Sequence, residues 1–282
     1  MAHRATLVAI IVLVQAADSA AGRSLGVSEN GAGLFANVQV ASLVNGRFAV
    51  PKNTTELLVE VGCSNRNTMD QEVLPKRKSA FLFSFEPLLD KYAALLARGD
   101  FRFNKKVRDL SVPLGHHDPR GIVLPIAVAP QSGSFPINVS RISGYSSLLP
   151  ISATSEGRWH PQCRQKVETR IVPAITLARV LELLPPLPIH LLKLDVQGLD
   201  LDLLKATPLA LFGRVESIEL EVINSRSPRE KGHAPCPVLY EGQPRLDDVV
   251  AHMKTIGCQV RRVGDWAGHL RCEGAGLFTR AT

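Results

Sequence analysis

The chain has few aromatic side chains, which make up only 5% of its 282 residues. Its core must therefore be built mostly from leucine, valine, isoleucine and alanine. The shares of hydrophobic (45%) and charged (21%) residues are those of a globular protein. The net charge of +7 is spread along the chain, with residues 76–78, 105–106 and 261–262 as its densest points. Nucleic-acid surfaces interleave such charges with exposed aromatics. We therefore predict no nucleic-acid partner and keep an anionic substrate as a lesser alternative.

The sequence also lacks an apolar run suited to a stable membrane span. Residues 5–14 are apolar but fall short of the roughly 20 residues that a transmembrane helix needs. Arg4 precedes this run and a small-residue stretch follows it, which is the pattern of a secretory signal cleaved after Ala21. We expect residues 1–22 to be a signal peptide or short leader, and the protein to be lumenal or secreted. An uncleaved anchor or an organelle-targeting leader is the alternative.

No internal repeat is visible after the leader. We expect residues 23–55 to be a linker and N-terminal extension, and residues 56–282 to form one domain. On the secretory route, the sequons at Asn53 and Asn138 become candidate glycosylation sites. Five cysteines leave at least one unpaired if all pairing is internal. We predict a bridge between Cys258 and Cys272, which would flank a terminal hairpin, with five free thiols as the alternative.

Hydrophobic periodicity predicts strands that alternate with helices, which indicates crossover units and a mainly parallel sheet. The last two strands have no helix between them, so one of them must run antiparallel to its neighbour. Residues 130–150 are predicted as a β-excursion over the crevice, and residues 151–170 as loop. The predicted strands are residues 57–61, 80–85, 121–129, 189–194, 215–223, 258–263 and 275–279, and the predicted helices are 88–98, 176–184, 199–206 and 246–256.

A complete glycine fingerprint for dinucleotides is missing. Gly62 follows the first strand and Glu60 lies just before it, but the second and third glycines are absent, which disfavours a pyrophosphate at this point. Glu86 ends the second strand, where a carboxylate can accept two hydrogen bonds from ribose hydroxyls. Alternatively, Glu86 stabilises the amino terminus of the following helix.

The most informative segment is residues 189–198, Ile-His-Leu-Leu-Lys-Leu-Asp-Val-Gln-Gly. A short apolar run contains Lys193 and is followed by Asp195, and an amphipathic segment begins after Gly198. Buried parallel strands end in this way at a ligand crevice. Because the two charged residues are two positions apart, they point to the same side of the strand. We therefore expect the catalytic residues to lie at the end of this strand.

Other polar residues are weaker candidates. Glu219 and Glu221 lie two apart on a strand, and Glu221 is a candidate for substrate contact. Tyr145 and Trp159 are candidates for acceptor-pocket walls, with ordinary loop packing as the alternative. Residues 116–118 (His-His-Asp) and the pair His160 and Cys163 lack partners at metal-ligand spacing, so we predict no metal site.

Four motifs in order give this chain a resemblance to the FkbM-type methyltransferases. They are Glu60-x-Gly62, then residues 85–87 (Phe-Glu-Pro), residues 192–198 and Glu219-x-Glu221. The resemblance runs from about residue 57 to 278. It implies a class I methyltransferase fold, a Rossmann-like α/β sheet with helices on both faces, and S-adenosylmethionine as cofactor. The cofactor-binding residues that it implies are Glu60, Gly62, Cys63, Ser64, Asn65, Glu86, Pro87, Ala127 and Val128.

The chain departs from the family pattern at Gln197, where the family usually has a glutamate. The resemblance implies that Asp195 faces the transferred methyl group, and we expect it to act as the base, with Lys193 lowering its pKa or holding the acceptor. An ion pair that braces the strand end is the alternative for Lys193. We expect O-methylation of a small-molecule or glycan hydroxyl. The alternatives are a secreted, non-catalytic binding domain with the same fold and, disfavoured by the missing glycines, a nucleotide-sugar enzyme.

Overall fold

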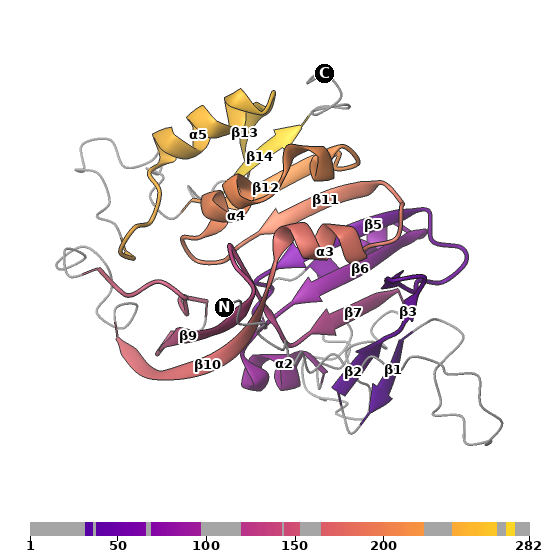
Figure 1. Cartoon of the computed structure of the whole chain (residues 1–282), viewed down its shortest axis with the longest axis horizontal. Coiled ribbons are helices and arrows are strands. Elements are labelled where there is room, and N and C mark those ends of the chain that lie inside the picture. Colours follow the sequence, from indigo (N-terminus) through magenta and orange to yellow (C-terminus); the bar gives the residue numbers. More distant parts are fainter. Residues whose placement is uncertain are drawn as a thin grey trace, which may run out of the picture.

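A seven-stranded mixed sheet forms the centre of the computed structural model (Figure 1). The structure describes residues 32–35, 38–65, 69–96, 120–142, 144–152, 165–222, 239–263 and 269–273. The strand order is β13-β14-β12-β11-β5-β6-β7, and β14 runs opposite to the other six strands. The bounds are β5 Glu56–Val61, β6 Ala80–Phe85, β7 Gly121–Leu124, β11 Ile189–Leu194, β12 Ser217–Glu221, β13 Gln259–Val263 and β14 His269–Glu273.

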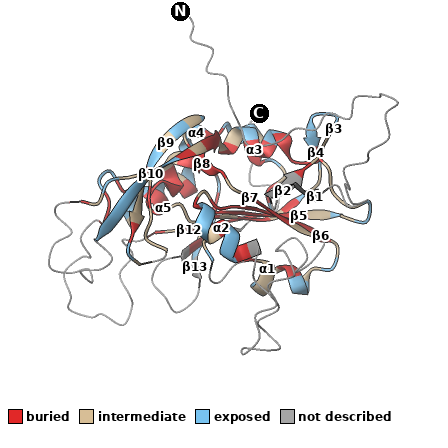
Figure 2. Ribbon diagram, turned by 90° about the horizontal axis from the view of Figure 1, so that it is seen from below, coloured by how far each residue is buried: buried red, intermediate tan, exposed pale blue. Residues whose placement is uncertain are grey.

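Helices cover both faces of this sheet, because its central strands are apolar on both sides. In β5, Val59 belongs to one core cluster with α3, α4 and α5, whereas Leu58 belongs to a second cluster with α1 and the short helix η1. Figure 2 shows α3 and α4 on one face and α1 on the other. The predicted α/β class I fold is confirmed. The helix bounds are α1 Met69–Glu72, η1 Leu74–Lys76, α2 Leu89–Leu96, α3 Leu177–Leu183, α4 Asp200–Ala206, η5 Leu209–Phe212 and α5 Leu246–Thr255.

A second sheet of three strands lies at the carboxyl-terminal edge of the parallel strands (Figure 1). It consists of β8 Ala127–Ala129, β10 Lys166–Thr176 and β9 Gly133–Ser140, and it confirms the predicted β-excursion. Pro125 separates β7 from β8, and the two strands belong to different sheets. The prediction of loop up to residue 170 was wrong from Lys166 onward. Residues 166–169 are exposed and Arg170 is half-buried, so their strand conformation depends on pairing with β9 and not on a buried apolar face.

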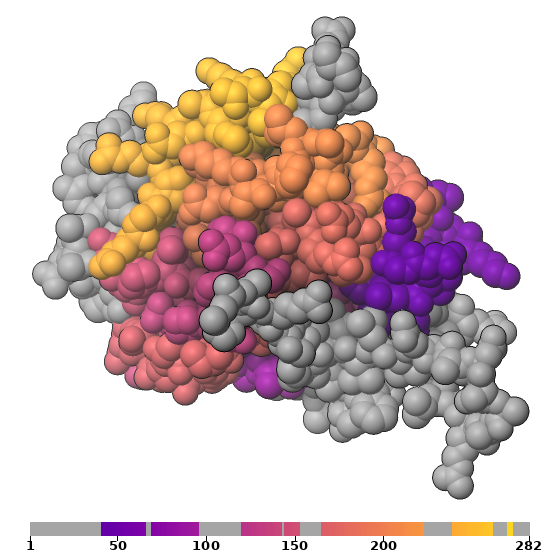
Figure 3. Space-filling view, in the orientation of Figure 1, coloured from indigo at the N-terminus to yellow at the C-terminus, as the bar shows by residue number. Residues whose placement is uncertain are grey.

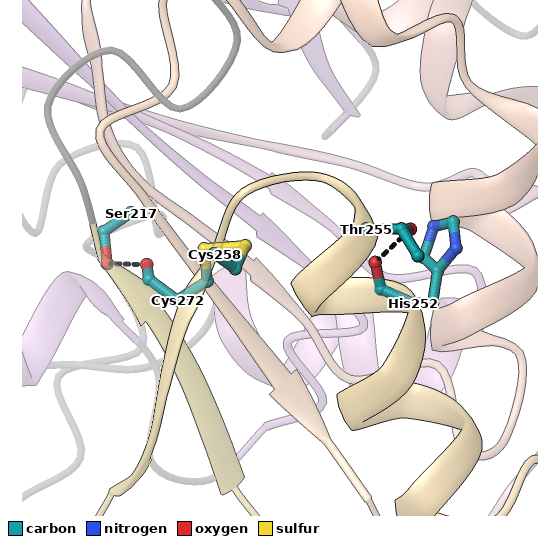
Figure 4. Close-up of a disulfide and its surroundings, with 5 residues drawn as sticks. All are labelled: Ser217, His252, Thr255, Cys258 and Cys272. Carbon is teal, nitrogen blue, oxygen red and sulfur yellow. Dashed lines mark hydrogen bonds between the residues drawn. A yellow bond between two sulfur atoms is a disulfide. The ribbon is translucent and has the colours of Figure 1, made fainter.

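The C-terminal hairpin is closed by a disulfide between Cys258 and Cys272, as predicted, with the two Cα atoms 5.2 Å apart. Its second strand, β14, occupies residues 269–273, where no strand was predicted, and the predicted strand at 275–279 lies outside the described residues. Only Leu270 and Cys272 of β14 are apolar, and both are buried. Figure 4 shows the bridge beside Ser217, whose hydroxyl donates to the Cys272 carbonyl at 3.2 Å.

The N-terminal extension contains short paired strands within residues 32–48. They are β1 Ala32–Phe35, β2 Val38–Ala41, β3 Leu43–Val44 and β4 Arg47–Phe48. Phe48 packs on Phe83 of β6, with ring centroids 5.2 Å apart, so this segment contributes to the main core. No helix in the described part of the chain is long and apolar enough to cross a membrane.

Candidate functional site

A cavity lies where β5, β6 and β11 end, with about 630 Å³ of empty space that includes its opening to solvent. Parallel strands present their carboxyl ends at one edge of the sheet, and this edge is where open α/β sheets bind ligands. The cavity is lined by the strand ends, by β8 and by the excursion around β9. Its lining includes Gly62, Ser64, Glu86, Pro87, Lys91, Ala127, Val128, Ile137, Ser147, Asp195 and Gln197.

Gly62 permits the close approach of two strand ends at the floor of the cavity. Its φ is +80°, and a Cβ at this position would lie 2.0 Å from the backbone oxygen of Asp195. The amide of Asp195 donates to the Val61 carbonyl at 2.9 Å, and the amide of Gly62 donates to the Phe85 carbonyl at 3.0 Å. Three strand ends are therefore held together by backbone contacts that leave no room for a side chain.

Glu86 is buried in the wall of the cavity beside Ser64. Its carboxylate accepts hydrogen bonds from the amide of Ser64 (2.8 Å) and from the amide of Leu88 (3.0 Å). Burial raises the pKa of Glu86, while Lys91, also in the wall, counteracts this shift. Each carboxylate oxygen has a second lone pair, so the group can still accept from ligand hydroxyls. Glu86 therefore binds an amide just before α2 and also lines the cavity.

The hydroxyl of Ser64 marks the same wall as a ligand site. It is buried and has no hydrogen-bond partner among the described residues. Buried polar atoms are rarely left in this state, and a bound ligand or water commonly satisfies them. Together with Glu86, this hydroxyl gives the wall two polar groups that can bind a ligand with hydrogen-bonding groups.

A hydrogen-bonded group of three side chains lies at the β11 side of the cavity. The amide nitrogen of Gln197 donates to Oδ1 of Asp195 at 2.8 Å and to Oε2 of Glu221, which ends β12. Burial, followed by the nearby charge of Asp195, raises the pKa of Glu221 well above its usual value. The neutral amide of Gln197 therefore holds the carboxyl groups of Asp195 and Glu221 close together. Asp195 and Gln197 line the cavity, whereas Glu221 does not.

The turn that carries Gln197 is held from several sides. Gln197 has a φ of +55°, which is unusual for a residue with a side chain. The Ser147 hydroxyl donates to its backbone carbonyl at 2.8 Å. The carboxylate of Asp200 accepts from the amides of Val196 and Gly198, and burial, then the charge of Asp195, raises the pKa of Asp200 to about 7.

The hydroxyl of Tyr240 contacts the side chain of Gln197. Its hydroxyl lies 3.1 Å from Oε1 of Gln197 and 2.8 Å from the carbonyl oxygen of Tyr145, both of which are acceptors. The amide of Glu241 donates to the Pro150 carbonyl at 2.9 Å, so the segment from residue 239 lies against the excursion, as the yellow and magenta atoms in Figure 3 show. Sequence reasoning missed Tyr240 and Ser147, because neither belongs to a local motif.

Two predicted site residues form a buried ion pair within the sheet. Glu60 accepts from the Met69 amide (3.0 Å) and from the Lys193 ammonium (3.5 Å), and burial raises the pKa of Glu60 to about 7. Burial lowers the pKa of Lys193, but attraction to Glu60, Asp195 and Glu219 outweighs this effect and raises it. Neither Glu60 nor Lys193 lines the cavity. Glu60 instead ties the start of α1 to β5.

The other predicted residues are divided between the cavity and its surroundings. Cys63 is buried against α2 with Tyr92 and Leu95, and Asn65 is exposed in the turn after it. Tyr145 contributes its carbonyl to Tyr240 and is not part of the cavity lining. Residues 116–118, Trp159, His160 and Cys163 lie outside the described residues. Among the residues that are described, no group of His, Cys, Asp and Glu is arranged to hold a metal ion.

Comparison with known proteins gives one match. The family model of the methyltransferase FkbM domain matches residues 55–236, which contain β5, β6, β11 and β12 and thus the strand ends described above. Searches of curated proteins and of solved structures found no match. The matched region covers well over half of the chain and includes all four motifs of the site. The chain belongs to the FkbM methyltransferase family.

Proposed function

We propose that this methyltransferase uses S-adenosylmethionine and methylates an oxygen of a small-molecule or glycan hydroxyl. The observation that carries the proposal is that Glu86 and Asp195 line one cavity, beside the tight turn at Gly62. Glu86 would hold the ribose hydroxyls, and the unsatisfied Ser64 hydroxyl would hold a polar group of the methionine part. Ala127 and Val128 would lie beside the adenine. When bound, the cofactor supplies a methyl group on a positively charged sulfur.

Asp195 would act as the base for the acceptor hydroxyl. Gln197 holds one of its carboxylate oxygens at 2.8 Å and so fixes the direction in which the carboxylate points. A positioned base contributes about 10²–10⁴-fold to a proton transfer of this kind. Most of the remaining rate comes from holding the acceptor in line with the methyl group. In this arrangement Lys193 would act at a distance, through its charge beside Glu60 and Asp195.

A cofactor analogue tests the role of Asp195 without knowledge of the acceptor. Sinefungin carries an ammonium group on the carbon that replaces the methyl-bearing sulfur, whereas S-adenosylhomocysteine carries no charge there. We expect the wild type to bind sinefungin about tenfold more tightly in calorimetric titration, because Asp195 attracts the ammonium group. Asp195→Asn should remove this preference and leave the affinity for S-adenosylhomocysteine within about twofold.

Asp202→Asn is the matched control for this measurement. Asp202 lies in α4, and its side chain is not part of the cavity lining. The control variant should keep the full preference for sinefungin. Equal affinity of the wild type for both analogues, or a preference that survives Asp195→Asn, would show that Asp195 does not face the transferred group.

We also propose that the protein works on the secretory route. The disulfide between Cys258 and Cys272 supports this location, since such bridges persist mainly in oxidising compartments. S-adenosylmethionine would then have to reach the enzyme from the cytosol. Retention of cofactor binding with no transfer to any glycan or metabolite would instead favour a non-catalytic binding role.

A further inference from the structure

The two sequons of this chain lie in very different surroundings. Asn53 belongs to the sequon Asn-Thr-Thr and Asn138 to the sequon Asn-Val-Ser. The first lies in an exposed turn before the central sheet, and the second lies within β9. Sequence alone makes the two sites equivalent acceptors for an N-linked glycan. Their hydrogen bonds and burial separate them.

Asn53 is presented on an ordered turn. The side chain is exposed, and the turn is closed by the amide of Thr54, which donates to the Pro51 carbonyl at 3.0 Å. Thr55, the hydroxyl residue of the sequon, is also exposed, and its own amide is held by the Ser79 carbonyl at 2.9 Å. A glycan on Asn53 would therefore point into solvent without breaking a contact of the fold.

Asn138 does not line the cavity itself, but it is bonded to a segment that does. Its backbone pairs with Ser147 in both directions, at 2.8 and 3.1 Å, and its side-chain nitrogen donates to the Leu149 carbonyl at 3.0 Å. Ser140, the hydroxyl residue of this sequon, is buried, and its hydroxyl accepts from the amide of Ile142 at 3.3 Å. A glycan on Asn138 would push residues 147–149 away from β9 and so deform the cavity that Ser147 lines.

The two sites also differ in their distance from the proposed cofactor. Asn53 precedes β5, and the cavity lies at the opposite end of this strand, where Val61 and Gly62 line it. Six residues of strand span about 20 Å. Asn53 is therefore remote from the cavity, whereas Asn138 is bonded to Ser147, which lines it.

We infer that Asn53 carries an N-linked glycan and that Asn138 carries none. The side-chain nitrogen of Asn53 would attack C1 of a lipid-linked oligosaccharide. An N–C1 bond forms, the bond from C1 to the lipid diphosphate breaks, and the diphosphate leaves while one amide proton is lost. The disulfide in the C-terminal hairpin supports passage through a compartment where this donor is present. The inference rests on the secretory route proposed above, and it does not depend on the methyltransferase chemistry.

The test is expression of the full chain in cultured insect cells, followed by glycan release with peptide N-glycosidase in ¹⁸O-labelled water. Release converts a modified asparagine to labelled aspartate, so peptide mass spectrometry reports each sequon separately. We expect the label at residue 53 and not at residue 138. Thr55→Val should abolish the modification, and the conservative Thr55→Ser should retain it, with both variants equally well folded.

A second arm places the same chain behind a heterologous secretion signal. A label at residue 53 in this arm alone would support Asn53 as the acceptor and reject the chain's own leader as the signal. Absence of label in both arms, or a label at residue 138, would overturn the inference. S-adenosylhomocysteine binding by the same preparations reports on the proposed cofactor site independently.

Discussion

Replacing Gly62 by alanine is expected to lower the free energy of unfolding by about 3 kcal/mol and to abolish binding of S-adenosylhomocysteine. The added Cβ would lie 2.0 Å from the Asp195 carbonyl oxygen and 2.8 Å from its carbon. Both atoms belong to the backbone and cannot rotate away, so the ends of β5 and β11 must separate. Forced overpacking of this kind costs about 1–3 kcal/mol, and the positive φ adds about 1 kcal/mol. Urea unfolding and calorimetric titration measure the two effects.

Gly46 provides a matched control for the backbone strain alone. It has a φ of +75° in the turn between β3 and β4, and a Cβ there would meet nothing within 4 Å. Gly46→Ala should therefore cost only about 1 kcal/mol and leave ligand binding unchanged. If the two alanine variants were equally stable and bound the ligand equally well, the close contact between the strand ends would have no energetic importance.

The second large effect is expected at Gln197, where glutamate should destabilise the protein by about 3 kcal/mol at pH 8. The substitution removes the amide that donates to Asp195 and Glu221 and puts a third carboxyl group between them. Loss of a buried hydrogen-bonded network around charged groups has a cost of this size. The adjacent Glu221 already has a raised pKa, so a further carboxyl group beside it adds to the repulsion.

The pH dependence of this loss follows from the direction of the pKa shift. A carboxyl group added beside two others has a folded-state pKa above its unfolded value of about 4.3. The folded state then binds more protons than the unfolded state. The loss of stability is therefore small below about pH 4.3 and grows as the pH rises through the pKa of the folded state. Urea unfolding of the wild type and of Gln197→Glu from pH 4 to 8 measures this difference in the free energy of unfolding.

The double variant Gln197→Glu/Glu221→Gln is the control for this substitution. It keeps one amide and two carboxyl groups in the network and should recover most of the stability at pH 8. A single variant as stable as the wild type across the pH range would show that the amide of Gln197 does not hold the two acids together.

Much of the central sheet was predictable because its strands are short apolar runs that end at glycine or at a polar residue. The strands β5, β6 and β11 and the helices α3, α4 and α5 were all predicted within a few residues. Six of the nine predicted cofactor residues line the cavity, since the ends of adjacent parallel strands must meet at one edge. Of the three that do not, Glu60 contacts the start of α1, Cys63 packs against α2, and Asn65 is exposed.

Lys193 shows why strand alternation alone was insufficient. Two positions apart on one strand, Lys193 and Asp195 were expected to face the crevice together. In the structure, Lys193 is paired in register with Glu60 of β5 and Glu219 of β12, whereas Asp195 lies just beyond the strand end. Its charge is therefore matched by neighbouring strands, and only a knowledge of the strand order reveals this.

The contact between Tyr240 and Gln197 could not be predicted for a similar reason. The two residues are 43 positions apart, and the segment of Tyr240 has no hydrophobic period that would place it. Its position depends on pairing with residues 150–152, at the end of an excursion whose own path is set by β10. Such long-range contacts are specified by the whole fold and carry no local signal.

The most direct test of the proposed cofactor site is calorimetric titration of the protein with S-adenosylmethionine and S-adenosylhomocysteine. We predict micromolar binding of both. We also predict a loss of about 100-fold in affinity, roughly 2.7 kcal/mol, in Glu86→Gln, because this variant removes the carboxylate that we propose to bind the ribose hydroxyls. The melting temperature of the variant, measured alongside, separates lost contact from unfolding. No binding of either ligand to the folded wild type, or undiminished binding to folded Glu86→Gln, would contradict the assignment.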